Sequence, residues 1–108
     1  MSAMATARAA PAAYPHIEKD PRICAGKACI EGTRIRVLDI VGLHRRGLKP
    51  EDMLDVYAVR LTLAQVYSAL AYYHDHKHEL EAELREDRKA VAQIERDQAR
   101  LLKQRRAR

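Results

Sequence analysis

After Pro50 the sequence contains neither proline nor glycine through Arg108. These two residues are the usual breakers of helices, so their absence permits long helices in the second half of the chain. Cysteine is also scarce, because Cys24 and Cys29 stand alone. Two cysteines without a secretory signal do not form a disulfide framework. We therefore expect reduced thiols and a cytoplasmic protein.

Long apolar runs are absent as well. No run approaches the roughly 20 residues that a membrane-spanning helix needs. The N-terminal segment is rich in alanine, but alanine is too weakly apolar for a secretory signal, and Pro11 and Pro15 interrupt the segment. We expect neither a membrane anchor nor a targeting signal.

Constellations of catalytic or metal-binding residues are also missing. Gly26-Lys27 lacks the earlier glycine and the following Ser or Thr of a phosphate-binding loop. His74 and His78 are one helical turn apart but have no third ligand nearby, and the two cysteines with His16 make at most a partial zinc site. We therefore expect a binding protein with no catalytic residues, cofactor or metal.

Length and charge limit the remaining possibilities. The chain has 108 residues and a mass of 12.3 kDa, so it forms one small core at most, and oligomerisation or a partner is the natural source of further stability. Its 20 Lys and Arg residues against 15 Asp and Glu residues give a pI near 9.5. This excess permits nucleic acid or an acidic protein surface as the partner and does not select between them.

The N-terminal part of the chain changes character near His16. Residues 1–15 show no apolar periodicity, which predicts a disordered tail. From Ile17 to Val37, turn residues alternate with short β-branched pieces, and Gly26 and Gly32 offer positions where positive φ is easily adopted. We expect two or three short strands here. The Gly-Thr-Arg turn, with Arg34 at its tip, is either a structural clasp or a contact, and the local backbone roles of glycine and threonine favour the clasp.

Two helices are then predicted by their end signals. Asp39 suits the start of a first helix, about residues 38–46, and Gly47 is placed just past its end. Pro50 opens a second helix, although Lys49 stands where a capping residue is usual. The apolar residues of that second helix are Met53, Leu54, Val56 and Tyr57.

A third helix begins after Thr62, which is a good N-cap. Its apolar stripe is Leu63, Val66, Leu70 and Tyr73, which leaves Gln65, Ser68 and Tyr72 on the surface. Two helices joined by about four residues match a helix-turn-helix. We therefore predict a mainly α fold. A homeodomain-like three-helix module, with a short β-hairpin before its helices, occupies residues 16–78, and a long helical arm follows over 79–108.

The arm continues the stripe of the third helix in one heptad register. Counted from Leu63, nine of twelve seam positions are apolar, which predicts a long helix that buries its stripe against a second copy or another protein. The seam positions are Leu63, Leu70, Lys77, Leu84, Val91 and Gln98, with Val66, Tyr73, Leu80, Asp87, Ile94 and Leu101. The chain end is rich in cations that no acid opposes.

One family shares the turns and their spacing. The chain resembles the family catalogued as domain of unknown function 433 over about Ile17 to Leu80. The resemblance rests on Ile17, Asp20-Pro21, Ile23-Cys24, Gly26-Lys27, Ile30, Gly32-Thr33-Arg34-Ile35, Val37, Gly47-Leu48, Pro50-Glu51 and Leu61-Thr62-Leu63. The turn Ala58-Val59-Arg60 lacks the proline that is usual in that family and is one residue longer.

The resemblance implies a function. Several members are similar to VapB antitoxins, which are encoded beside a toxin with a PIN-like ribonuclease fold. It thus implies an antitoxin that acts as a homodimer or as a hetero-oligomer with its toxin, whose acidic, metal-binding cleft the C-terminal arm blocks. The implied toxin-binding residues are Leu80, Leu84, Val91, Ile94 and Leu101, with the cations Arg100, Lys103, Arg105 and Arg106.

The same resemblance implies that the helix-turn-helix binds operator DNA. Base-edge candidates lie near the start of the third helix, and phosphate candidates are cations around the two helix ends before it. The base-edge candidates are Gln65 and Ser68, with Thr62 and Tyr67 beside them; the phosphate candidates are Arg36, Arg45, Arg46, Lys49 and Arg60.

Two other functions fit the same residues. A stand-alone DNA-binding regulator would dimerise through the long helix and bind specific DNA without a second protein. A protein interaction adaptor would have the helix-turn-helix shape but would not read DNA.

Overall fold

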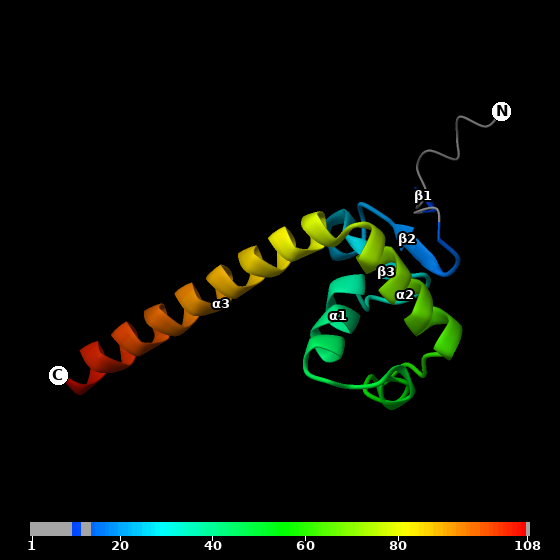
Figure 1. Ribbon diagram of the computed structural model, residues 1–108. Coiled ribbons are helices and arrows are strands. Elements are labelled where there is room, and N and C mark those ends of the chain that lie inside the picture. Colours follow the sequence, from blue (N-terminus) through cyan, green and yellow to red (C-terminus); the bar gives the residue numbers. More distant parts are fainter. Residues whose placement is uncertain (1–9, 12–13, 108) are drawn as a thin grey trace. The chain divides into compact units, whose positions relative to one another are not determined.

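The computed structural model describes residues 10–11 and 14–107. The predicted disorder of residues 1–9 and 12–13 lies outside the described residues. The chain divides into two compact units, Met1–His76 and Lys77–Arg108, two residues before the predicted boundary. The described residues form a mainly helical structure with a small antiparallel sheet (Figure 1).

The sheet of the first unit has the strand order β1-β2-β3. Its strands are β1 (Ala10–Pro11), β2 (Ile17–Lys19) and β3 (Ala28–Ile30). Ile17 pairs with Ile30 and Lys19 with Ala28, so β2 and β3 form the predicted antiparallel hairpin. Ala10 and Pro11, which the sequence placed in the tail, pair with β2 instead.

The Gly-Thr-Arg turn after β3 is held by the side chain of Thr33. The Thr33 hydroxyl donates to the carbonyl of Ile30 at 2.8 Å and accepts from the backbone N–H of Ile35 at 3.0 Å. Gly32 has a φ of 78°, which a glycine adopts without strain. These two local bonds confirm the clasp and lead the chain into the first helix.

Helix α1 (Val37–Arg45) begins and ends as its sequence predicts. The Asp39 carboxylate accepts from the backbone N–H of Arg36 at 2.9 Å, which stabilises the N-terminus. Gly47 has a φ of 93° just past the C-terminus. Ile40 and Val41 are at most 1% exposed, so this face of α1 belongs to the core.

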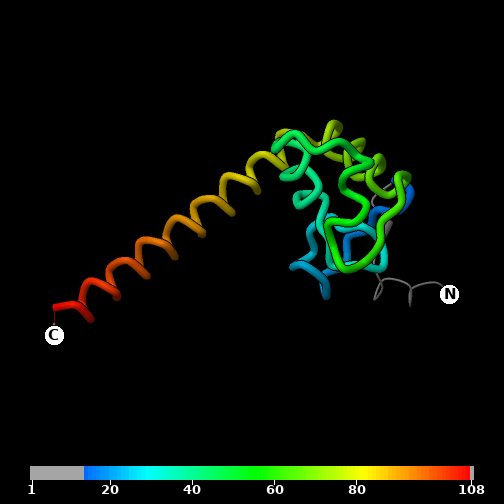
Figure 2. Tube along the Cα trace, turned by 90° about the horizontal axis from the view of Figure 1, so that it is seen from below, coloured from blue at the N-terminus to red at the C-terminus, as the bar shows by residue number. Residues whose placement is uncertain are grey.

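The predicted second helix is wrong beyond its first turn. Pro50 begins only a short 3₁₀ helix, η3 (Pro50–Met53), and the chain then turns irregularly up to Arg60. In an α-helix the carbonyl of Leu54 would accept from Ala58; here it accepts from the N–H of Leu61 at 3.2 Å and closes a loop. The connection between α1 and the next α-helix is therefore long, as the Cα trace in Figure 2 shows.

The start of η3 also differs from the prediction in its capping. Lys49 offers no side-chain acceptor, but the Asp52 carboxylate accepts from the Lys49 backbone N–H at 3.3 Å. Asp52 therefore supplies part of what a capping residue at Lys49 would have given.

Helix α2 (Leu63–Asp75) follows the N-cap Thr62, as predicted, and contacts α1, η3, β2 and β3. Val66 and Ala69 are fully buried, whereas Leu63 is 38% exposed. The prediction that Tyr72 lies on the surface is wrong, because Tyr72 is only 2% exposed. The rings of Tyr14 and His76 cover it, with centroids 5.2 and 4.0 Å away.

The heptad register predicted from Leu63 into the arm does not run through one helix, because the helix is interrupted at His76. His76 has φ −127° and ψ 34°, outside the helical region, and its backbone N–H donates to the carbonyls of Tyr72 and Tyr73. Its ring nitrogen Nδ1 lies 2.9 Å from the Tyr72 carbonyl oxygen. The second unit then consists of α3 (Lys77–Arg106), a helix of 30 residues.

Candidate interaction surfaces

Two of the predicted DNA-binding residues, the base-edge candidate Gln65 and its neighbour Thr62, bond to each other's backbone. The Thr62 hydroxyl accepts from the Gln65 N–H at 3.2 Å, and the Gln65 side-chain carbonyl accepts from the Thr62 N–H at 2.8 Å. This reciprocal pair is a capping box. The side-chain NH₂ group of Gln65 still has two donors for a ligand, but the position of this side chain is set by the helix start.

Further along α2, Tyr67 and Ser68 differ in accessibility. Tyr67 is 51% exposed, while Ser68 is half-buried. Tyr67 is thus the more accessible of the two on this part of α2.

The predicted phosphate contacts differ in their surroundings. Arg45, Arg46 and Lys49 are exposed within five residues at the C-terminal end of α1. Arg36 differs, because its guanidinium Nη2 is 3.0 Å from Asp39 Oδ1 and its side chain is 27% exposed. Arg36 is therefore a structural partner of the α1 start rather than a cation open to solvent.

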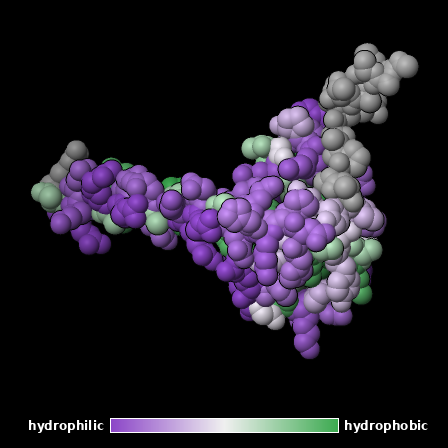
Figure 3. All heavy atoms as spheres, turned by 45° about the horizontal axis from the view of Figure 1, so that its top comes forward, coloured by the Kyte–Doolittle hydropathy of each residue, from purple (hydrophilic) through white to green (hydrophobic). Residues whose placement is uncertain are grey.

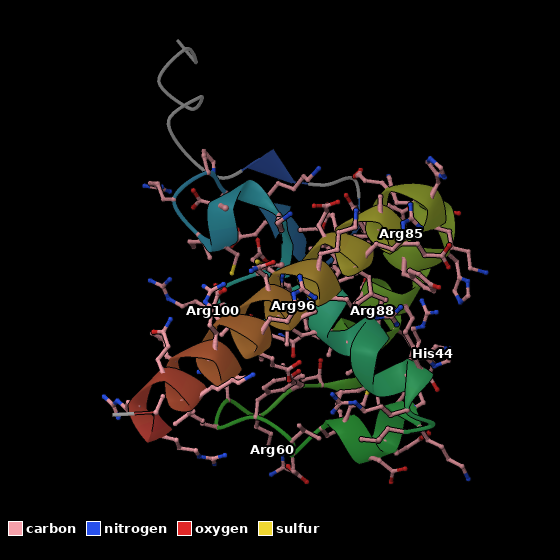
Figure 4. All side chains as sticks on the ribbon, turned by 90° about the vertical axis from the view of Figure 1, so that its left-hand side faces the viewer. His44, Arg60, Arg85, Arg88, Arg96 and Arg100 are labelled. Atoms are coloured by element: carbon pink, nitrogen blue, oxygen red, sulfur yellow. The ribbon has the colours of Figure 1, made fainter. Side chains whose placement is uncertain are left out.

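Arg60 projects from the irregular segment before α2 (Figure 4). Its Nε lies 3.9 Å from Asp55 Oδ1, and both side chains are more than 80% exposed. Such a long, solvated pair holds neither side chain firmly.

On α3, four large apolar side chains are more than half exposed. These are Val91, Ile94, Leu101 and Leu102, at 53–58%. Leu84 is half-buried, and Leu80 is only 3% exposed. Leu80, one of the predicted toxin-binding residues, is therefore covered in this structure, and the exposed stripe begins after it. In the space-filling view, green apolar side chains interrupt the hydrophilic surface of α3 (Figure 3).

The cations at the end of α3 remain in solvent. Arg100 Nη2 is 3.0 Å from Asp97 Oδ1, one turn earlier. Among the described residues, Lys103, Arg105 and Arg106 are exposed and have no carboxylate within ion-pair distance. Positive charge also suits the C-terminus of a helix, so these residues stabilise α3 itself.

Sequence reasoning missed a hollow of about 600 Å³ in the first unit. One side is the Gly-Thr-Arg turn, and the other is the irregular segment that replaces the predicted second helix. Burial raises the pKa of the Tyr57 hydroxyl in its wall. The feature of the sequence that could have indicated this hollow is the turn Ala58-Val59-Arg60, which lacks the usual proline and is one residue longer. The lining residues are Ile23, Gly32, Thr33, Arg34, Ile35, Asp39, Tyr57, Ala58 and Val59.

The two cysteines are free thiols in different surroundings. Cys29 is 2% exposed, and its burial, with the neighbouring Cys24 thiol, raises the pKa of Cys29 to about 12. Cys24 is half-buried and donates from Sγ to the carbonyl of Arg34 at 3.3 Å. Both thiols are therefore placed as small packing groups beside the hairpin.

The described ranges 10–11 and 14–107 contain neither a cluster of metal ligands nor a helix suited to span a membrane. No group of three or more His, Cys, Asp or Glu side chains there is arranged to hold a metal ion. In the same ranges no helix is both long enough and apolar enough to cross a membrane.

Comparison with known proteins places the first unit. Residues 17–73 match the family model described as "Protein of unknown function (DUF433)". No curated protein matches the chain. A DUF433 member from Anabaena variabilis, whose crystal structure is known, is 29% identical, with a TM-score of 0.58 over 63% of this chain. The match spans 66% of that protein, slightly under two thirds of its length. The matched residues make up more than half of the chain, which therefore belongs to the DUF433 family.

Proposed function

We propose that this protein is an antitoxin whose helix α3 binds and neutralises a PIN-like ribonuclease and whose first unit binds operator DNA. The observation that carries the proposal is the exposed stripe of α3. Val91, Ile94 and Leu101 are each more than half exposed on a helix whose other faces are strongly charged. Covering a stripe of this kind with another surface removes apolar area from water and lowers the free energy.

The basic end of α3 supports a partner with an acidic cleft. A PIN-like active site gathers carboxylates around a divalent cation, and a guanidinium or ammonium group inserted there would take over part of the cation's charge. Lys103, Arg105 and Arg106 are exposed and solvated, so they are accessible to such carboxylates. In this proposal the apolar stripe provides the anchor and the cations block the site.

The neutralisation test uses two adjacent positions on α3. Ile94 is on the stripe, whereas Gln93 lies off it and bonds to Asp97 and Arg96 of its own helix. Each is replaced by Glu in the full chain, which is then titrated into the ribonuclease encoded beside it while RNA cleavage is measured. Ile94→Glu is expected to weaken inhibition about tenfold or more, because the charge must be desolvated at the contact. Gln93→Glu should inhibit like the wild type.

Equal inhibition by both variants, or no inhibition by the wild-type chain, would remove α3 as the inhibitory element. A requirement for the basic end is measured separately with Arg105→Ala and Arg106→Ala. If the cations occupy the acidic cleft, the double variant should still bind the ribonuclease through the stripe while losing most of its inhibition.

For the DNA-binding component, the supporting observation is the exposed basic group at the end of α1. Arg45, Arg46 and Lys49 lie within five residues, and Tyr67 on α2 is half exposed. Fluorescence anisotropy with duplexes from the chain's own promoter, repeated over a range of salt, measures this binding. Arg46→Ala is expected to weaken binding to all sequences and to reduce the salt slope by about one unit.

The alternatives predict different results. A stand-alone regulator would show specific DNA binding with no effect on the ribonuclease, and an interaction adaptor would show little salt dependence with random duplexes.

A further inference from the structure

The heptad seam of α3 contains two polar residues, Asp87 and Gln98, between Leu84 and Leu101. One seam row of the described helix contains Leu84, Val91 and Gln98, and the other contains Asp87, Ile94 and Leu101. Asp87 and Gln98 are symmetrically placed about the middle of the stripe, because each lies three residues from one end of the segment 84–101. A second copy of the helix would therefore meet them differently in each orientation.

In a parallel pair each seam residue faces its own counterpart. Asp87 would then face Asp87 of the second copy at a buried position, and two carboxylates in such contact repel strongly. Gln98 would likewise face Gln98. The parallel orientation thus places like charges against each other within the apolar contact.

In an antiparallel pair each seam row faces the other seam row of the second copy. The seam of the helix is then complementary to itself. Leu84 faces Leu101 of the second copy, and Val91 faces Ile94. Asp87 faces Gln98, whose side-chain NH₂ group can donate to the carboxylate. All apolar seam residues from 84 to 101 then meet apolar residues, and each polar residue meets a hydrogen-bonding partner.

The charges outside the seam favour the same register. In this register residues 79–87 lie opposite residues 98–106 of the second copy, so almost the whole of α3 overlaps. The first segment contains five acids and one Arg: Glu79, Glu81, Glu83, Glu86, Asp87 and Arg85. The second contains four cations and no acid: Arg100, Lys103, Arg105 and Arg106. A parallel pair would bring acids against acids and cations against cations.

We propose that α3 pairs antiparallel with α3 of a second copy of this chain, with Asp87 opposite Gln98. The proposal goes beyond the antitoxin function and does not rest on it, because it concerns the chain by itself. Only four apolar layers hold the pair together, so the dimer is expected to be weak and concentration-dependent. A partner that binds the stripe would compete with the second copy.

Disulfide trapping in the full chain distinguishes the orientations. In a background with Cys24→Ser and Cys29→Ala, Leu84→Cys and Leu101→Cys are made separately and then mixed under mild oxidation. Antiparallel pairing predicts a cross-linked dimer only in the mixture, since two copies of position 84 would be about 25 Å apart at 1.5 Å per residue, too far for a disulfide. Cross-linking of each variant alone would demonstrate a parallel pair and overturn the proposal.

The matched control places cysteines on the opposite face of the helix. Lys89→Cys and Arg96→Cys lie opposite each other in the same register, with both side chains outside the seam. Their mixture should not cross-link. If it cross-links as readily as the 84 and 101 mixture, the trapping reports random collision and the proposal fails.

A second measurement keeps the native cysteines, under reducing conditions. Sedimentation equilibrium gives the dimer dissociation constant for Gln98→Asp and Gln98→Lys, with Gln93→Asp and Gln93→Lys as controls of equal charge off the seam. Gln98→Asp should weaken the dimer about tenfold or more, because it faces Asp87, and Gln98→Lys should tighten it. A monomeric wild type at all concentrations, or equal effects at positions 93 and 98, would overturn the proposal.

Discussion

Asp20 is a buried acidic residue of the first unit, with a side chain that is 5% exposed. Its Oδ1 accepts from the backbone N–H and the Nε of Arg22 at 2.9 and 3.0 Å, and its Oδ2 accepts from Nη2 at 2.9 Å. These bonds from Arg22 lower the pKa of Asp20 below its ordinary value of 3.8. The carboxylate thereby closes the turn that follows β2.

Replacement of Asp20 by Asn tests this closure. A lowered pKa in the folded state stabilises the fold above pH 3.8, and this contribution is lost as the pH falls through the folded-state pKa. Asp20→Asn should therefore lower the melting temperature at pH 7, and the difference from wild type should shrink below pH 3.8. Melting curves at pH 7 and pH 3 measure it. An equal difference at both values would show that charge plays no part.

At the scale of single elements, the first turn of α2 is stabilised by Thr62. Because the Thr62 hydroxyl satisfies the Gln65 N–H at 3.2 Å, Thr62→Ala should cost about 1 kcal/mol of unfolding free energy. Thr62→Ser keeps the acceptor and serves as the control. Urea unfolding followed by tyrosine fluorescence measures both. Equal stability of all three proteins would contradict the capping role.

Substitutions in the same turn can distinguish a structural role of these residues from a DNA-binding role. Thr62→Ser preserves the cap, so any change in DNA affinity would come from the lost methyl group at the helix start. Gln65→Glu also keeps a carbonyl-type acceptor for the Thr62 N–H but removes the two side-chain donors. These two substitutions are therefore better probes of the α2 surface than alanine.

For the whole molecule, the distribution of burial between the two units decides where stability resides. Ile30, Ile40, Met53 and Val66 are 0% exposed in the first unit, whereas α3 has only Leu80 as a buried residue. The five tyrosines of the sequence all precede His76. Tyrosine fluorescence therefore reports the unfolding of the first unit without a contribution from α3.

Two identical substitutions, one in each unit, test this distribution. Ile40→Ala should lower the unfolding free energy of the first unit by about 2–5 kcal/mol, because it leaves a cavity in the core. Ile94→Ala removes the same atoms from a side chain that is 56% exposed and should change it by less than about 0.5 kcal/mol. Urea unfolding monitored by tyrosine fluorescence gives both values. Similar losses would mean that the stripe contributes to folding of the first unit.

The sequence by itself determined the features that depend on neighbours three or four residues away. Asp39 in the first turn of α1, Gly47 after α1 and Thr62 before α2 act through bonds or backbone angles within one turn, so composition and spacing predicted them correctly. The stretch without proline or glycine likewise predicted the 30-residue α3.

Only the tertiary structure decided the features that depend on distant residues. The segment after Met53 has helical spacing, but the bond from Leu61 to the Leu54 carbonyl turns it into a loop and opens the hollow beside Thr33. Tyr72 is buried because Tyr14, which is far away in the sequence, covers it. Such contacts form only once the chain has folded, so no periodicity in the sequence contains them.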